Sequence, residues 1–198
     1  MRASEYLRIA QNEVGYIGKV SNKDLDDPTA NTIGNYTKYA RDIDQTSFLN
    51  GRKQAFAWCT TFQLWCAYQA CGCNEEETLK HFKIGKLSAG VGYHKMYYAN
   101  ANKVGNEPKV GACVYFKDSS GQLAHVGIVK EINGNTFTTI EGNVSQKVVN
   151  KTYTLGNKYV DSFSYPDFDD EPEPPVEDWK TIAEWDGKEG KTYRLQEK

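Results

Sequence analysis

The sequence lacks an apolar run long enough to cross a membrane, and charges interrupt its first ten positions, where a secretion signal needs an unbroken apolar stretch. We therefore expect no membrane partner and a protein that is made in the cytoplasm. A basic stripe is also lacking, so we expect no nucleic-acid partner. Residues 1–165 carry 19 Lys and Arg against 15 Asp and Glu, which suits an anionic partner, although charges so scattered are also typical of a solvated surface.

The sequence also lacks the cysteine pattern of a disulfide framework or a zinc site. The five cysteines are an odd number and cluster in the first two thirds of the chain, which does not indicate a disulfide framework. Cys71 and Cys73 have no second pair at zinc spacing, and Asp42 and Asp44 lack the additional oxygen ligands and the glycine turn of a calcium loop. We expect no metal and no cofactor.

The periodicity of the apolar residues changes once along the chain. It is helical up to about residue 101, where Ser4 as N-cap and Gly15 as stop bound the first helix, although residues 88–92 are too glycine-rich for regular structure. From Val110 it alternates, with hairpin turns such as residues 119–121. This order predicts an α+β fold, with helices packed on a curled antiparallel sheet. The expected helices are 4–14, 35–41, 58–72, 75–82 and 93–101, and the expected strands are 110–116, 124–132, 135–141, 148–155 and 159–165.

The helix expected over residues 58–72 carries the first candidate for chemistry. Cys59 lies in its first turn, where unpaired backbone N–H groups and the positive end of the helix dipole stabilise a thiolate. A thiolate is a nucleophile. The alternative is a buried, inert thiol, which is what we expect of Cys66.

Two further candidates lie at strand ends. His125 opens the second strand and Glu141 closes the third, so the imidazole is a candidate base and the carboxylate a candidate to fix its tautomer. A three-residue turn over residues 132–134 with a glycine bulge sets them opposite each other on one face, and we predict that turn. Taken alone, His125 is equally well explained as a structural residue. His81 and His94 are expected to be surface or packing histidines.

Three ordered blocks of the sequence resemble the CHAP domain, the cysteine, histidine-dependent amidohydrolase/peptidase of bacterial and phage wall lysis. The resemblance covers roughly residues 3–166 and implies a papain-like α+β fold. It makes Cys59 the nucleophile, His125 the base, Glu141 the orienting acid and Asn143 an added polar member of the site. The blocks are Ala57-Trp58-Cys59 with Phe62, Trp65 and Cys66, then residues 124–129 (Ala-His-Val-Gly-Ile-Val), then residues 139–143 (Thr-Ile-Glu-Gly-Asn).

The resemblance implies a peptidoglycan hydrolase that cuts an amide bond of the wall, either an N-acetylmuramoyl-L-alanine amidase or a peptide-bridge endopeptidase. Trp58 and Tyr36 are candidates to line its substrate groove. Two alternatives stay open, namely an intracellular cysteine protease or deamidase on the same scaffold and a non-catalytic wall-binding module. We expect a monomer that reaches the wall as a phage endolysin released through a holin, or as a secreted enzyme whose signal has been removed.

The end of the chain differs in composition from the rest. Residues 166–178 hold four of the six prolines, seven acids and no base, which is typical of an extended, solvated linker. Residues 179–198 are too short for a core of their own, although Asp186-Gly187 would permit a hairpin. We expect a catalytic domain over residues 1–165, a linker over 166–178, and a tail that either starts a wall-binding module or docks on the domain.

Overall fold

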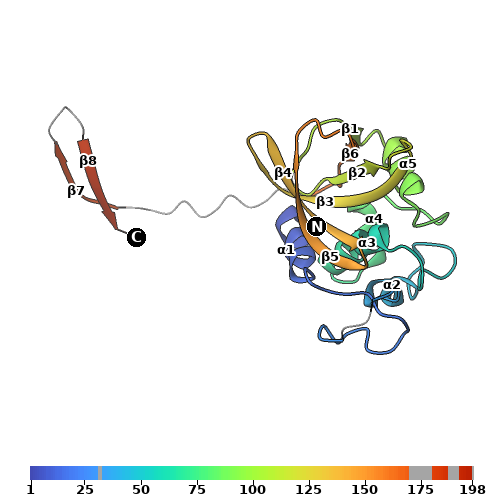
Figure 1. Ribbon diagram of the computed structural model, residues 1–198. Coiled ribbons are helices and arrows are strands. Elements are labelled where there is room, and N and C mark those ends of the chain that lie inside the picture. The colour runs from blue at the N-terminus through green and yellow to red at the C-terminus, as the bar shows by residue number, and fades with distance from the viewer. Residues whose placement is uncertain (31–32, 170–179, 187–191, 198) are drawn as a thin grey trace.

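The computed structural model describes residues 1–30, 33–169, 180–186 and 192–197. Within these ranges the helices come first along the chain and the long strands follow, so the predicted α+β class is confirmed. Figure 1 shows α1, α2 and α3 gathered on one side of the sheet. The helices are α1 (Ala3–Asn12), α2 (Lys38–Ile43), α3 (Cys59–Ala70), α4 (Glu75–His81) and α5 (Val91–Asn100).

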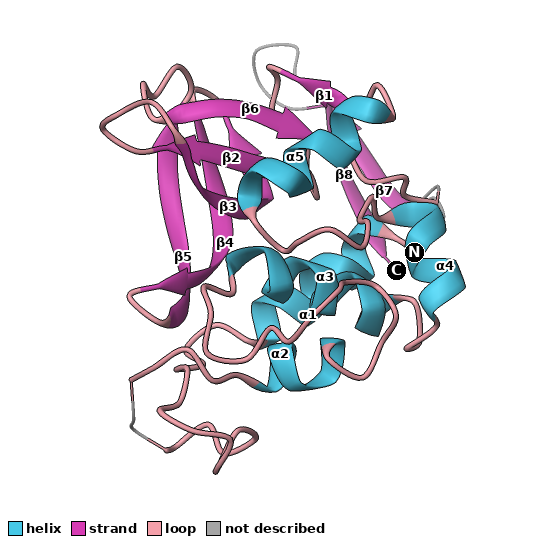
Figure 2. Cartoon of the chain, turned by 90° about the vertical axis from the view of Figure 1, so that its right-hand side faces the viewer, coloured by secondary structure: helices cyan, strands magenta, loops and turns pink. Residues whose placement is uncertain are grey.

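One antiparallel sheet has the strand order β1-β6-β2-β3-β4-β5. Consecutive strands from β2 to β5 pair with one another, whereas β6 returns to pair with the other edge of β2. Figure 2 shows the resulting curl, in which β6 runs across the direction of β5. The strands are β1 (Val104–Gly105), β2 (Cys113–Lys117), β3 (Leu123–Asn133), β4 (Thr136–Val144), β5 (Lys147–Thr154) and β6 (Val160–Ser164).

Helix starts differ from the prediction for local reasons. The first helix begins at Ala3 with Arg2 as N-cap, so Ser4 is not the cap. The second begins after Thr37, whose hydroxyl accepts a hydrogen bond from the Ala40 N–H at 3.0 Å. The fifth begins within the glycine-rich stretch that we expected to be irregular. None of the helices in the described ranges is long and apolar enough to pass through a membrane.

The central element of the core is α3. Its residues from Cys59 to Ala67 are all buried, and α1, α2, α4, β3 and β4 pack against it. Cys66 is fully buried, as expected, and burial raises the pKa of its thiol well above the ordinary value. The helix that begins at Cys59 is thus held by packing on several sides.

Strand β2 contributes side chains to two apolar clusters. Cys113 and Tyr115 face the cluster under the helices, while Val114 and Phe116 face a second cluster within the curl. Because successive side chains of a strand point to opposite faces, this apolar run fits a strand that is buried on both faces. The neighbouring β3 and β4 also contribute to both clusters, which fixes the strands that carry the candidate site.

The connection between β3 and β4 corrects one prediction. Asn133 pairs with Thr136, so the chain reverses in a plain two-residue turn, Gly134-Asn135. The bulged turn predicted over residues 132–134 is therefore wrong. The irregularity lies inside β3, before the turn, around Lys130, where the pairing shifts by one residue.

The bulge inside the strand decides how the two candidate residues face each other. Beyond it, Ile128 pairs with Ile140. Continuing this register sets Glu141 opposite Gly127 and not opposite His125. Because side chains alternate with a period of two, Glu141 and His125 nevertheless lie on the same face.

At the chain's end, β7 (Lys180–Asp186) pairs antiparallel with β8 (Thr192–Glu197), as the sequence permits. Residues 170–178 of the predicted linker lie outside the described residues. The four residues before them lie against the domain. The Phe168 ring is 5.9 Å from the Tyr6 ring, and the Asp167 N–H donates to the His81 carbonyl.

Candidate active site

The nucleophile candidate stands at the start of the central helix. Trp58 is the N-cap of α3 and its side chain makes no capping hydrogen bond. The N–H groups of the first turn also have no carbonyl partner within the helix, so the positive helix end is left for another acceptor. Cys59 is 6% exposed and lines a cleft of about 520 Å³. Its sulfur therefore lies at the positive end of a helix and borders a cleft.

The imidazole of His125 connects the other two candidates. Its ring hydrogen-bonds to the Cys59 thiol, and its Nε2 is 3.0 Å from Oε2 of Glu141. The His125 side chain is 23% exposed, whereas the Glu141 side chain is fully buried. The structure thus brings together the cysteine, histidine and acid that the sequence singled out.

Two further side chains hold the buried carboxylate. The hydroxyls of Thr139 and Tyr153 both donate to Oε1 of Glu141, at 2.6 and 2.7 Å. Phe116 packs on the Tyr153 and His125 rings, with centroids 4.8 and 5.9 Å apart. Sequence reasoning missed all three. Thr139 could have been found, because it lies two residues before Glu141 on the same face, but Tyr153 required the register of β5.

Hydrogen bonding keeps the acid ionised. Burial pushes the pKa of Glu141 up, but hydrogen bonds from His125, Thr139 and Tyr153, together with the imidazolium charge, outweigh it and lower the pKa. The carboxylate therefore stays negative at neutral pH and can orient and stabilise an imidazolium.

The pKa of His125 is shifted in the opposite direction from that of Glu141. Burial alone would lower the pKa of His125, but hydrogen bonds to Cys59 and Glu141, with their charges, raise it from 6.5 to about 9. At neutral pH the ring is thus an imidazolium, and it forms an ion pair with the ionised Glu141. Because this pKa is raised in the folded state, the pair's contribution to stability is complete below pH 6.5 and is lost as the pH rises through about 9.

Replacing Glu141 by glutamine is expected to lower the pH at which activity is lost. Glutamine removes a charge and a hydrogen bond that raise the His125 pKa, so the alkaline limb of kcat/KM should move down by about one pH unit, with a rate near pH 7 reduced about 10-fold. Measuring kcat/KM from about pH 5 to about pH 11 locates this alkaline limb. Glu131→Gln, an exposed glutamate of the same hairpin, is the matched control, and an unmoved limb in the Glu141 variant contradicts the assignment.

Two glycines next to the acid make these approaches possible. A Cβ at Gly127 would lie 2.8 Å from Cγ of Glu141, so the acid reaches His125 by lying across a residue with no side chain. A Cβ at Gly142 would lie 2.8 Å from the Phe62 ring of α3. The absence of both side chains lets β4 approach β3 and the cysteine helix closely.

The cleft around the sulfur has both apolar and polar side chains in its walls, among them Arg52 and Ser88. Phe56 and Leu87 line it and are 65% and 62% exposed. Trp58 does not line it, because its ring is fully buried and packs against aromatic rings of the core, so its prediction as a groove residue is wrong. Tyr36 is half-buried where its backbone bridges to Lys19, and it is not among the residues that line this cleft.

Asn143 lies beside the histidine without bonding to it. It lines a hollow of about 330 Å³ together with His125, Glu141 and Tyr153. Its backbone has φ 67°, and its Oδ1 is buried without a hydrogen-bond partner among the described residues. The asparagine is thus a polar neighbour of the site whose oxygen is left for a further donor.

The remaining histidines pack, as expected. His94 is fully buried, stacks on Phe82 at 5.2 Å and has its pKa lowered to about 3 by burial. His81 is buried and lies against the Met1 amino group. In the described part of the chain no group of three His, Cys, Asp or Glu side chains is placed to hold a metal ion.

Comparisons with known proteins bear on the identity of this arrangement. The family model of the CHAP domain matches residues 51–143. No curated protein sequence matches the chain. Two similar solved structures are described as "The crystal structure of Ly7917" (TM-score 0.47) and "The crystal structure of Ly7917 with the hydrolyzing product of MDP" (TM-score 0.48).

Both structures are 14% identical to this chain and are matched over 84% of it. The chain covers 62% and 63% of their own lengths, which is less than two thirds. The matched family segment holds Cys59, His125, Glu141 and Asn143. The CHAP family model therefore covers all three sequence blocks and confirms the resemblance that they predicted.

Proposed function

We propose that this chain is a peptidoglycan hydrolase that cuts an amide bond of the bacterial cell wall with Cys59 as its nucleophile. One observation carries the proposal: within a CHAP domain, the His125 ring bonds on one side to the thiol at the helix start and on the other to the buried Glu141. A nucleophile, a base and an orienting acid in this order are the parts of an acyl-transfer site.

The first half-reaction forms a thioester. The Cys59 thiolate attacks the amide carbonyl carbon, a C–S bond forms, and the carbonyl oxygen takes the negative charge. The Cys59 N–H at the helix start is placed to donate to that oxygen. When the intermediate collapses, the C–N bond breaks and the His125 imidazolium gives its proton to the departing amine.

The second half-reaction returns the enzyme. His125 is now neutral and takes a proton from water, and the oxygen of that water attacks the thioester carbon. The C–S bond breaks, which leaves a carboxylic acid on the product and a thiolate on Cys59. Glu141 stays ionised throughout and stabilises the imidazolium each time it forms.

The alternatives make different demands on the chain. A non-catalytic wall-binding module has no use for a histidine bonded to both a thiol and a buried acid, so the geometry favours an enzyme. A protease or deamidase would use the same three residues and differ only in substrate. Delivery to the wall, through a holin or by secretion, is part of the same proposal.

The test is the mass of what the protein releases. Purified sacculi are incubated with the full chain, and soluble fragments are analysed by mass spectrometry. We expect released fragments, with a new N-terminal alanine if the enzyme is an amidase and a new N-terminus on a bridge or stem residue if it is an endopeptidase. Degradation of a soluble protein such as casein with intact sacculi would identify the protease alternative instead.

A further inference from the structure

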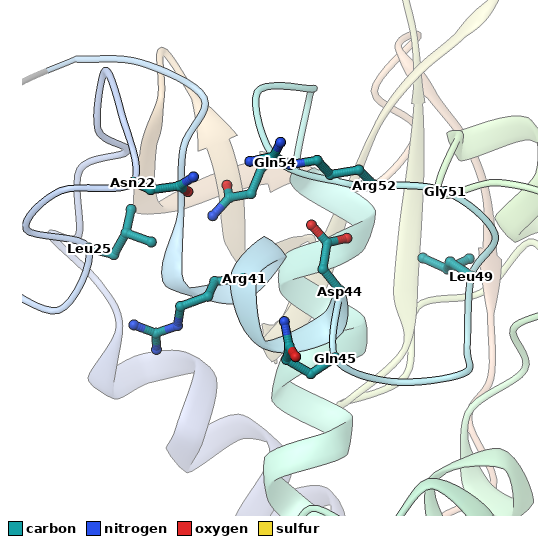
Figure 3. A pocket seen from close by; sticks show the side chains of 9 residues that line it. All are labelled: Asn22, Leu25, Arg41, Asp44, Gln45, Leu49, Gly51, Arg52 and Gln54. Carbon is teal, nitrogen blue, oxygen red and sulfur yellow. The ribbon is translucent and has the colours of Figure 1, made fainter.

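A second hollow adjoins the catalytic cleft. Its volume is about 530 Å³, and Arg52 lines both it and the cleft that holds Cys59. Figure 3 shows Asn22 and Leu25 on one side of this hollow and Leu49 on the other, with Asp44 between them. The polar hollow is defined by Asn22, Leu25, Arg41, Asp44, Gln45, Leu49, Gly51, Arg52 and Gln54.

The loop between the two hollows is fixed in place. The Lys53 N–H donates to Oδ1 of Asp44 at 2.7 Å, and the Lys53 ammonium donates to the backbone carbonyls of Asn50 and Gly51. Both atoms of the Gln54 amide bond to the Thr37 backbone at 2.9 Å. Since this side of the polar hollow is already ordered, a ligand that binds there would not lose affinity to its ordering.

Several polar groups of the hollow are left without partners. Among the described residues, nothing hydrogen-bonds to the side chains of Asn22, Gln45 and Arg52, or to the second carboxylate oxygen of Asp44. These groups offer both donors and acceptors. The apolar side chains of Leu25 and Leu49 lie beside them. The hollow therefore combines hydrogen-bonding groups with a small apolar surface.

The charges of the hollow nearly balance. Arg41 is neutralised by Asp26 and Asp42, to which it donates at 2.5 and 2.8 Å. The remaining guanidinium, Arg52, shares the hollow with the carboxylate of Asp44. A bare anion or cation would therefore meet a like charge as well as an opposite one. Neutral ligands that carry hydroxyl and amide groups fit this lining better.

We infer that the polar hollow is a binding subsite for a neutral, N-acetylated sugar of the glycan strand, with the attached peptide entering the cleft at Cys59. This inference rests on the proposed function. Arg52, which borders both hollows, lies where sugar and peptide join. Hydroxyl and acetamido groups meet the unpaired side chains, and the acetyl methyl group meets Leu25 and Leu49.

Strands of N-acetylglucosamine, which are neutral and carry no peptide, test the subsite without catalysis. The full chain is titrated with these strands and binding is followed by calorimetry. Asn22→Ala combined with Gln45→Ala removes two exposed side chains that bond to nothing in the protein, so the fold should be unaffected. We expect binding to weaken at least 10-fold, because two hydrogen bonds to the ligand are lost.

A matched variant controls for loss of surface amides. Asn12→Ala with Asn150→Ala removes two exposed amides outside the hollow and should bind as the wild type does. Equal binding by both double variants, or none by the wild type, overturns the subsite. If the wild type binds strands with this dependence but releases nothing from sacculi, the subsite stands and the proposed hydrolase fails.

Discussion

Replacing Cys59 by alanine is expected to abolish the release of soluble fragments from sacculi, with a rate at least about 10⁴-fold below the wild type. Without the sulfur no thioester forms, and His125 and Glu141 retain nothing to activate. His125→Ala should cost a similar factor, and the double variant should cost no more than either single one, because nucleophile and base act as a unit. Turbidity loss of a sacculus suspension measures all three.

Another free thiol supplies the control. Cys73 is exposed and lies after α3, away from the cleft, so Cys73→Ala should keep the wild-type rate. A thermal melt of Cys59→Ala close to that of the wild type shows that the fold is intact. Lysis by a folded Cys59→Ala variant would refute the assignment of the nucleophile.

The identity of the three catalytic candidates could be read from the sequence. Helical spacing placed Cys59 in a first turn, and period-two alternation placed His125 and Glu141 at strand ends. The turn was wrong, yet the shared face was right. The true register sets Glu141 two residues from the predicted partner, and a shift of two residues leaves a strand's faces unchanged.

Contacts that depend on packing between elements could not be read in the same way. Trp58 adjoins the nucleophile in sequence, but the residue before a helix can point into the core or out of it, and only the packing of α3 against Tyr16 and Tyr39 decides that it points inward. Tyr153 bonds to Glu141 across two strands whose register is set by a second bulge, between Glu141 and Val144.

Replacing Gly127 by alanine is expected to lower kcat/KM about 100-fold, although Cys59 and His125 themselves are not changed. The added methyl would overlap Cγ of Glu141, which three hydrogen bonds hold in place. The carboxylate must shift away from His125, which removes both orientation and charge from the imidazolium. Overpacking at this buried contact should also lower the free energy of unfolding by about 1 to 3 kcal/mol.

The control is Gly92→Ala, which separates the contact with Glu141 from the effect of replacing any glycine by alanine. Gly92 lies in α5, a Cβ there meets nothing within 4 Å, and alanine is the better helix former, so activity should be unchanged and stability equal or higher. An NMR titration of His125 supplies the decisive reading. In Gly127→Ala the imidazole should titrate below the wild-type value of about 9, because Glu141 no longer supports its proton. If the pKa of His125 stays near 9 while activity falls, the glycine acts by some route other than the acid.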